Sequence, residues 1–454
     1  MGAYLLLHGV LVYIGFLVAA AGLSLAFLSQ RYWFARAWRF AGRVCRPAFR
    51  KGIRGALILA LVVIVVAAIA ATIRNAHGIV SRGSWWSALF GLWLASSIVS
   101  YLFIKLVAGA DWVWRLRRSP SSDKTGSSTA RPTAAMGGAP QESINHSRRY
   151  FFQAAGVIAG AVPFVSATYG FIEGRFHFTV RELEIPIANL PHALDGLRIT
   201  QLSDIHIGSY MPVAQVRRAV GMANELKGDL TVVTGDFITG RSDPLVDCIT
   251  ELSHLRAPLG VWGCNGNHEI YAQAEEKSAQ LFQKFGMKLL RQQNAELRWQ
   301  GSAFNLIGVD YQRQRDTDGN QAPMLVGMER LVRQGVPNIL LSHNPNSFRK
   351  AAELGIELSL AGHTHGGQVR VEILDHCWSP AEFLTPYVAG LYQRPLFAPS
   401  DWKDAADPTL RKPAVNEPQP ASAIYVNRGL GTIGAPIRLG VPPEISLITL
   451  RCAV

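Results

Sequence analysis

Cysteine is scarce in this chain and follows no recognisable motif. The five cysteines are Cys45, Cys248, Cys264, Cys377 and Cys452. They include no CxxC pair, and their odd number and wide spacing do not form a disulfide framework. This spacing excludes the common cysteine-based zinc and redox motifs. Four of the five lie in the part of the chain that we expect to be exported, where a disulfide is chemically allowed but cannot be paired from sequence. We therefore expect mostly buried thiols.

Charged side chains are missing from three long stretches near the amino terminus. Residues 3–29, 55–73 and 84–104 carry none, and each stretch is long enough to cross a hydrocarbon layer of ~30 Å as a helix. We expect a three-helix transmembrane region over residues 1–114. Few polar groups occur inside these spans, which argues against a channel or a transporter, because a substrate path needs such groups.

Acidic side chains are nearly absent from the first 150 residues. That part holds 18 Lys and Arg but 3 Asp and Glu, whereas residues 151–454 hold 27 and 29. The formal net charge of +13 therefore belongs to the membrane part and does not indicate a nucleic-acid partner. The basic residues gather in loops 31–54 and 105–149, which predicts that both loops are cytoplasmic.

The amino-acid composition changes after the third apolar stretch. Residues 115–146 are rich in Ser, Gly, Pro, Thr and Ala, which predicts a flexible cytoplasmic linker. Residues 147–172 then begin with Arg148 and Arg149 and continue as an apolar segment. This segment resembles a twin-arginine export signal, and an ordinary fourth membrane helix is the alternative. Both interpretations carry the following domain, residues 178–454, across the membrane. Cleavage near Ala167 is left open.

From about residue 178 the sequence has the pattern of an α/β domain. Short apolar runs recur and each ends in a polar turn: LRITQLSDIHIG, LTVVTGDFITG, GVWGCNGNHEI, NILLSHNP and LSLAGHTHGG. Helical patterns over residues 212–226 and 272–285 lie between them, so the runs predict strands joined by crossovers. Asp, Asn and His gather just past the carboxyl ends of these strands, the edge at which α/β sheets form ligand sites.

Eight side chains in these turns form the candidate site: Asp204, His206, Asp236, Asn267, His268, His343, His363 and His365. A carboxylate can bridge two cations, and imidazole and amide groups complete their coordination without adding negative charge. The set therefore suits two divalent ions, for which manganese, iron and zinc are all compatible with mixed nitrogen and oxygen ligands. Two ions about 3.5–4 Å apart make a shared hydroxide nucleophilic and stabilise a phosphoryl group under in-line attack.

The ordered blocks DIH, GD, GNHE, SHN and GHTH resemble the motifs of the calcineurin-like metallophosphoesterase superfamily. The sequence that flanks these blocks resembles the membrane-associated bacterial subgroup of that superfamily. The resemblance covers residues 178–454. It implies two mixed β-sheets packed as a sandwich flanked by helices. It also implies two sets of metal ligands, one of Asp204, His206, Asp236 and His365, the other of Asp236, Asn267, His343 and His363. Asp236 would bridge the ions, and His268 would protonate the leaving oxygen or stabilise transition-state charge.

One departure from the superfamily pattern narrows the range of expected substrates. Phosphoprotein phosphatases follow their GD with two residues and then Asp and Arg, whereas here Asp236 is followed by Phe237, Ile238, Thr239 and Gly240. A phosphoprotein substrate is therefore disfavoured. Glu269 occupies a place where relatives often have Asp, and we interpret it as a supporting residue rather than a catalytic one.

The sequence thus predicts a metal-dependent phosphoesterase, a phosphodiesterase or a phosphomonoesterase, at a bacterial inner membrane with its domain on the extracytoplasmic side. Its expected partners are the lipid bilayer, a small-molecule or lipid-linked phosphoester and the twin-arginine export machinery. Two alternatives are a UDP-2,3-diacylglucosamine pyrophosphatase of lipid A synthesis, which would need a cytoplasmic domain, and a non-catalytic binding module anchored in the membrane.

Overall fold

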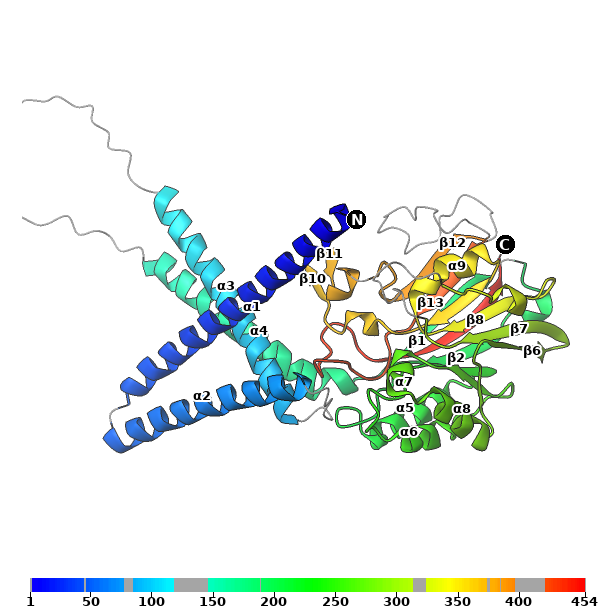
Figure 1. Ribbon diagram of the computed structural model, residues 1–454, viewed down its shortest axis with the longest axis horizontal. Coiled ribbons are helices and arrows are strands. Elements are labelled where there is room, and N and C mark those ends of the chain that lie inside the picture. Colours follow the sequence, from blue (N-terminus) through cyan, green and yellow to red (C-terminus); the bar gives the residue numbers. More distant parts are fainter. Residues whose placement is uncertain are drawn as a thin grey trace, which may run out of the picture. The chain divides into compact units, whose positions relative to one another are not determined.

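The computed structural model describes residues 2–44, 46–76, 85–117, 146–187, 189–312, 324–373, 376–383, 385–396 and 421–453 (Figure 1). These residues form two compact units. One comprises Met1–Ile73 and Leu89–Thr168, and the other comprises Arg74–Ala88 and Tyr169–Val454.

Long helices make up the first unit and continue into the second. They are α1 (Gly2–Gly42), α2 (Pro47–Ala76), α3 (Trp85–Arg117) and α4 (His146–Ile172). Two segments, Ala88–Trp114 and Ser147–Phe176, are long and apolar enough to cross a membrane. Only 17% and 11% of their most apolar windows are buried within the protein, as expected of helices surrounded by lipid rather than of core helices. The helices thus support membrane association.

The other membrane predictions stay predictions. Spans 3–29 and 55–73 fall within α1 and α2, but part of their side chains lies outside the described residues. Most of the predicted linker, residues 118–145, also lies outside them. Arg148 and Arg149 stand in the first turn of α4, which both the export signal and the membrane helix would allow.

Polar contacts join the helices of the first unit. Ser100 Oγ donates to the carbonyl oxygen of Gly160 at 2.7 Å, and Gln30 Nε2 donates to Ser97 Oγ at 2.6 Å. A Cβ added at Gly160 would lie 3.1 Å from Ile104, so the absence of a side chain lets α3 and α4 approach. Such small residues and hydrogen bonds are typical of helix packing in membranes.

The second unit contains two six-stranded mixed sheets. The first has the order β1 (Thr179–Ile187), β14 (Glu444–Cys452), β2 (Arg198–Leu202), β3 (Leu230–Thr234), β4 (Val261–Cys264), β5 (Lys288–Leu289). The second has the order β12 (Gly390–Pro395), β13 (Ala421–Val426), β9 (Leu358–Ala361), β8 (Asn338–Ser342), β7 (Ser302–Val309), β6 (Gln293–Trp299). In each sheet the strands that precede candidate ligands run parallel to one another.

Two-residue alternation along the strands builds the core between the sheets. On β3, Leu230 and Val232 join the core shared with the second sheet, whereas Val233 faces the helices outside the first sheet. Leu341 on β8 and Leu360 on β9 complete the shared core from the other side. The predicted sandwich of two mixed sheets is thus confirmed.

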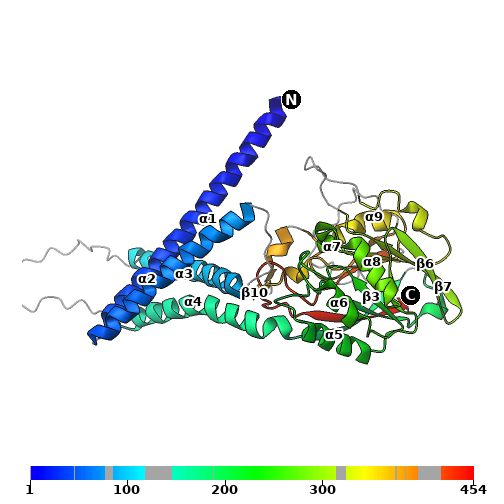
Figure 2. The ribbon, with the colours of Figure 1, turned by 60° about the horizontal axis from the view of Figure 1, so that its bottom comes forward.

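Helices cover the outer faces of both sheets (Figure 2). The first sheet packs against α5 (Val213–Glu225), α6 (Leu245–Leu252) and α8 (Glu275–Lys284), and the second against α9 (Phe348–Glu353). The predicted helix 212–226 matches α5. The helix predicted over 272–285 starts later, because Gln273 takes a left-handed backbone with φ 54° and separates α7 (Asn267–Ala272) from α8.

Candidate metal centre

All eight candidate side chains come from the carboxyl ends of five central strands. Asp204 follows β2, Asp236 follows β3, and Asn267 follows β4. In the second sheet His343 follows β8 directly, and His363 and His365 follow β9. Because the two sheets bring these strand ends together, the candidate ligands converge in three His and Asp groups that could hold metal ions.

The first group contains Asp204, His206 and His365, whose ligand atoms all lie within 4.8 Å of one another. His365 Nε2 lies 3.1 Å from His206 Nε2 and 3.4 Å from Asp204 Oδ1. All three residues are at least 97% buried, with exposed fractions of 0%, 3% and 2%. Two imidazole nitrogens and a carboxylate oxygen at such spacing match the donor set of a divalent transition metal.

The second group contains Asp236, His343 and His363. His343 Nδ1 lies 2.6 Å from the carbonyl oxygen of Thr234, which only accepts, so Nδ1 carries a proton and Nε2 is the ring nitrogen that could face a cation. Three buried polar atoms of the candidate ligands have no hydrogen-bond partner in the described protein: His343 Nε2, His363 Nδ1 and Asn267 Oδ1. Buried polar atoms are nearly always paired, so three unpaired acceptors in one place indicate a missing electrophile.

Asp236 stands between the two groups. Its Oδ2 lies 3.1 Å from His343 Nε2 and 3.4 Å from His206 Nε2, one residue from each group. Its Oδ1 faces the other way and accepts the backbone N–H of His268 at 3.0 Å. Asp204 Oδ1 also lies 3.9 Å from His343 Nε2, but a single oxygen of Asp236 lies closer to both groups, as a bridging ligand must.

His268 is half-buried beside the first group. Its ring meets that of His206 edge to face with centroids 4.8 Å apart. His268 Nδ1 lies 2.7 Å from the carbonyl oxygen of Thr239 and therefore donates to it. The remaining ring nitrogen, Nε2, is the one left for a substrate.

Burial and neighbouring charges shift the pKa values of the site residues in different directions. Burial raises the pKa of Asp236, but the imidazoles of His343 and His206 outweigh it and hold that pKa well below its usual range. Burial also lowers the pKa of His343, yet the carboxylates of Asp236 and Asp204 raise it to about 10. Burial and the charge of His343 lower the pKa of His363 to about 4. At neutral pH and without a cation, Asp236 is thus ionised and His363 neutral, both in the form that binds a cation, whereas His343 is protonated and would release a proton when a cation binds.

The candidate ligands have unusual backbone conformations. Five non-glycine residues of the site have a left-handed φ: Asp204 at 51°, His206 at 48°, Asp236 at 55°, His363 at 74° and His365 at 52°. Each such residue costs about 1–3 kcal/mol and persists only where the surroundings impose it. A cluster of five at converging strand ends indicates a site whose geometry is selected for function.

Glycines beside the ligands permit the close approach of neighbouring loops. A Cβ added at Gly362 would overlap Ser203 Oγ and Asp204 Oδ2, and one added at Gly266 would overlap Asp236 Oδ1. Gly235 additionally has a φ of 80°. At all three glycines an added side chain would therefore collide with a ligand or with the backbone that supports one.

We expect Gly266→Ala to lower the thermal unfolding midpoint of the full chain by about 6 °C or more, since overpacking of this kind costs about 3 kcal/mol. The added Cβ would also lie 2.5 Å from the backbone nitrogen of Asp236, which cannot rotate away. Differential scanning fluorimetry in detergent measures the midpoint. Gly221→Ala in α5 is the matched control, because nothing lies within 4 Å of a Cβ there, and its midpoint should not fall. Equal midpoints for both variants would contradict the crowding.

Four supporting residues complete the site, and the sequence did not reveal two of them, Thr239 and Arg438. Thr239 orients two histidines, through its Oγ1 at 3.0 Å from His206 Nδ1 and its carbonyl oxygen with His268. Arg438 is 1% exposed, and its Nη2 lies 3.3 Å from His365 Nδ1. The one sequence signal for Arg438 was a charge inside the apolar run GAPIRLGV, which is typical of a buried, paired side chain.

Glu269 accepts four backbone N–H groups, from Gly266, Asp236, Phe237 and Ile238, at 2.8–3.2 Å. It holds the two turns that carry Asp236 and Asn267 against each other. Asp310, another acidic residue at a strand end, accepts from Asn265 Nδ2 at 2.7 Å and from Arg291 Nε at 2.9 Å. It too supports the loop before Asn267.

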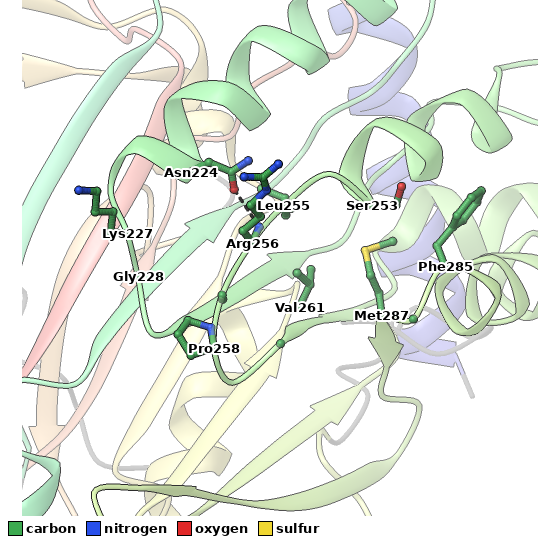
Figure 3. Close-up of a pocket in the computed structure, with 13 residues that line it drawn as sticks. Asn224, Lys227, Gly228, Ser253, Leu255, Arg256, Pro258, Val261, Phe285 and Met287 are labelled. Carbon is green, nitrogen blue, oxygen red and sulfur yellow. Dashed lines mark hydrogen bonds between the residues drawn. The ribbon is translucent and has the colours of Figure 1, made fainter.

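A separate pocket lies at the opposite ends of the strands of the first sheet (Figure 3). Its volume is about 650 Å³, and its lining includes Gly228 before β3, Gly260 before β4 and Met287 before β5. Asn224 Oδ1 accepts the backbone N–H of Arg256 at its edge. The residues that line this pocket include none of the eight candidates, so the metal centre and this pocket occupy opposite edges of the sheet.

Comparison with known proteins agrees with this geometry. Residues 197–367, which contain all eight candidates, match a family model described as calcineurin-like phosphoesterase. Over 305 residues the chain is 28% identical to a transmembrane protein with metallophosphoesterase domain from Danio rerio, covering 65% of this chain and 63% of that protein. A Bos taurus protein of the same description is 28% identical over 326 residues, covering 68% and 65%. The chain thus spans less than two thirds of each of these two relatives.

A bacterial relative is matched over almost its whole length. The metallophosphoesterase YkuE of Bacillus subtilis is 29% identical over 316 residues, which cover 67% of this chain and 98% of that protein. The likeness therefore extends over nearly the full length of that protein.

Proposed function

Because residues 197–367 match a family model described as calcineurin-like phosphoesterase, we propose that the protein is a metal-dependent phosphoric ester hydrolase that works with two divalent ions. The observation that carries this proposal is the second group of ligands. There the ligand atoms of Asp236, His343 and His363 lie within 4.8 Å of one another, and buried atoms of His343, His363 and the neighbouring Asn267 have no hydrogen-bond partner; a cation would satisfy these atoms.

The ligands divide between the ions as follows. One ion takes Asp204, His206, Asp236 and His365, and the other takes Asp236, Asn267, His343 and His363. The supports are the short distances within each group and the position of Asp236 Oδ2 between His206 and His343. When bound, such ions make water acidic enough to act as a nucleophile at neutral pH and offset the charge of a phosphoryl group.

His268 transfers the proton. Its backbone N–H is bonded to Asp236 and its Nδ1–H to Thr239, so backbone and ring are both held and Nε2 is the ring nitrogen that would meet a substrate. A ring held in this way can donate a proton to the leaving oxygen, or stabilise charge on it, without first being ordered.

The turn after Asp236 favours small or lipid-linked phosphoesters over phosphoproteins. Phe237 and Ile238 are buried in the core, and Thr239 orients two histidines, so this turn supports the site from within and presents no Asp and Arg pair to a peptide. Phosphomonoesters and phosphodiesters both fit a centre of this kind.

We place the domain outside the cytoplasm of a bacterial inner membrane. The basic loops 31–54 and 105–149 support a cytoplasmic start for α4, and Arg148 and Arg149 at its first turn support export by a twin-arginine route. A reporter fused after residue 300 tests this orientation, and activity in the cytoplasm alone would favour the UDP-2,3-diacylglucosamine pyrophosphatase reaction instead.

We expect chelation to abolish phosphoester hydrolysis by the purified full chain, and addition of manganese, iron or zinc to restore it at two ions per chain. Metal content by mass spectrometry and turnover of p-nitrophenyl phosphate and bis(p-nitrophenyl) phosphate check this together. Hydrolysis that persists in the chelated, metal-free protein would contradict the proposal. So would a fully metal-loaded protein that hydrolyses no phosphoester, which would favour a binding module.

A further inference from the structure

The end of the candidate span formed by α4 is hydrogen-bonded to the residue that supports His365. The span Ser147–Phe176 has 30 residues. A helix of that length measures about 45 Å against a hydrocarbon layer of about 30 Å, so its last turns reach the headgroup region. In those turns the carbonyl oxygen of Gly170 accepts the backbone N–H of Arg438 at 3.1 Å.

Arg438 links the end of α4 to the candidate metal centre. Its guanidinium contacts His365 twice, with Nη2 at 3.3 Å from Nδ1 and Nη1 at 3.4 Å from the carbonyl oxygen. It also donates through Nη1 to the carbonyl oxygen of Arg428 at 2.8 Å. One fully buried residue therefore spans from the end of the candidate membrane helix to a candidate ligand.

The segment next to Arg438 carries a hairpin. Leu439 pairs with the chain before it, its N–H donating to Gln368 at 2.9 Å and its carbonyl oxygen accepting from Arg370 at 2.9 Å. Strands β10 (Val371–Ile373) and β11 (His376–Trp378) follow as an antiparallel pair, and a short 3₁₀ helix, Pro380–Phe383, comes next. The hairpin thus begins six residues after His365 and beside the residue that holds the span end.

Three large apolar side chains of this hairpin face outward. Val371 is 43% exposed, Trp378 61% and Phe383 86%, and we call these three the apolar tip. The span end is exposed in the same way, with Tyr169 54% and Ile172 63% exposed. Tryptophan and other aromatic residues are enriched at the level of the headgroups, where one side of the ring is apolar and the other wet.

We infer that the apolar tip rests in the bilayer surface and that the metal centre acts on phosphoesters carried by membrane lipids. This inference rests on the proposed function for its chemistry. The span end is bonded to Arg438, and the next residue, Leu439, pairs with the chain immediately before the hairpin, so a membrane that holds the span end lies next to the hairpin. The GHTH loop and the hairpin are also packed together, since a Cβ added at Gly367 would overlap Ser379 Oγ.

The reaction is an ordinary hydrolysis. A bond between phosphorus and the oxygen of the leaving alcohol breaks, the oxygen of water forms a new bond to phosphorus, and a proton from that water passes to the leaving oxygen. No oxidant or further reactant is required.

The experiment compares one phosphodiester in two settings. The full chain in vesicles is given bis(p-nitrophenyl) phosphate in solution, or a nitrophenyl phosphodiester attached to a diacylglycerol in the same vesicles. We expect the double variant Trp378→Ser, Phe383→Ser to lose about tenfold in turnover of the lipid-borne ester, since both exposed side chains would lose apolar burial in the interface. Its turnover of the soluble ester should stay unchanged. Val246→Ser, which removes an exposed valine of α6, is the matched control and should alter neither.

A second readout does not depend on hydrolysis. Vesicles whose lipids are brominated in the upper acyl chain quench nearby tryptophans, and we expect Trp378→Phe to remove part of the quenching while Trp299→Phe on β6 removes none. Equal quenching before and after Trp378→Phe would overturn the docking. Equal loss of both esters in the double variant, or no preference of the wild type for the lipid-borne ester, would overturn the substrate class. A protein that hydrolyses neither ester but shows the quenching difference would refute the proposed function and leave the docking supported.

Discussion

Asp236→Asn is expected to lower phosphoester turnover by about a thousandfold and to reduce the metal content from two ions per chain to one or none. The side chain keeps its shape but loses the charge that faces both groups of ligands, through Oδ2 at 3.1 Å from His343 and 3.4 Å from His206. Metal ions contribute several kcal/mol to a phosphoryl transition state, and about 1.4 kcal/mol corresponds to a factor of ten.

The measurement joins metal analysis with steady-state kinetics on the same preparation. Asp247→Asn is the control, because it removes an exposed carboxylate from the first turn of α6 and should change neither quantity. If Asp236→Asn retained two ions and full activity, the shared carboxylate would not exist and the two-ion site would have to be abandoned.

His268→Ala is expected to lower turnover by about a hundredfold or more while both ions stay bound. The reason is that the backbone and the side chain of His268 have different roles. The backbone N–H of His268 bonds Asp236 Oδ1, and that contact survives the substitution, whereas the ring that faces the substrate is removed. Metal affinity and catalysis should therefore separate in this variant and fall together in Asp236→Asn.

Comparison with His254→Ala isolates the effect, because His254 is exposed and lies outside the site. Loss of metal from His268→Ala would identify His268 as a ligand rather than a proton donor. Unchanged turnover of every phosphoester would leave the domain without the catalytic residue that we assign and would favour a metal-dependent binding module.

The elements of the domain could be predicted where local pattern is strong. The apolar runs before Asp204, Asp236 and His343 are strands, and α5 matches its predicted range, because alternation and helical periodicity follow directly from which face is buried. The helix predicted over 272–285 was wrong at its start, since the left-handed Gln273 divides that stretch and no residue type there announces it.

Long-range pairing lay beyond the reach of local pattern. The last strand, β14, lies between β1 and β2 in the first sheet, more than 240 residues from Leu202 in sequence. Its position brings Arg438 behind His365, a contact between residues 73 apart. No local periodicity encodes such a partner, because it is decided by how two sheets bury their apolar faces against each other.

The sequence by itself determined the chemistry that this protein can offer: charge-free stretches for a membrane, and Asp, Asn and His at strand ends for cations. The tertiary structure alone decided which of those atoms meet. It directed Asp236 Oδ2 toward both groups, and it paired the end of α4 with Arg438 and the chain before the hairpin with Leu439. The physical reason is that residue type fixes what an atom can bind, whereas the packing of distant strands fixes where that atom lies.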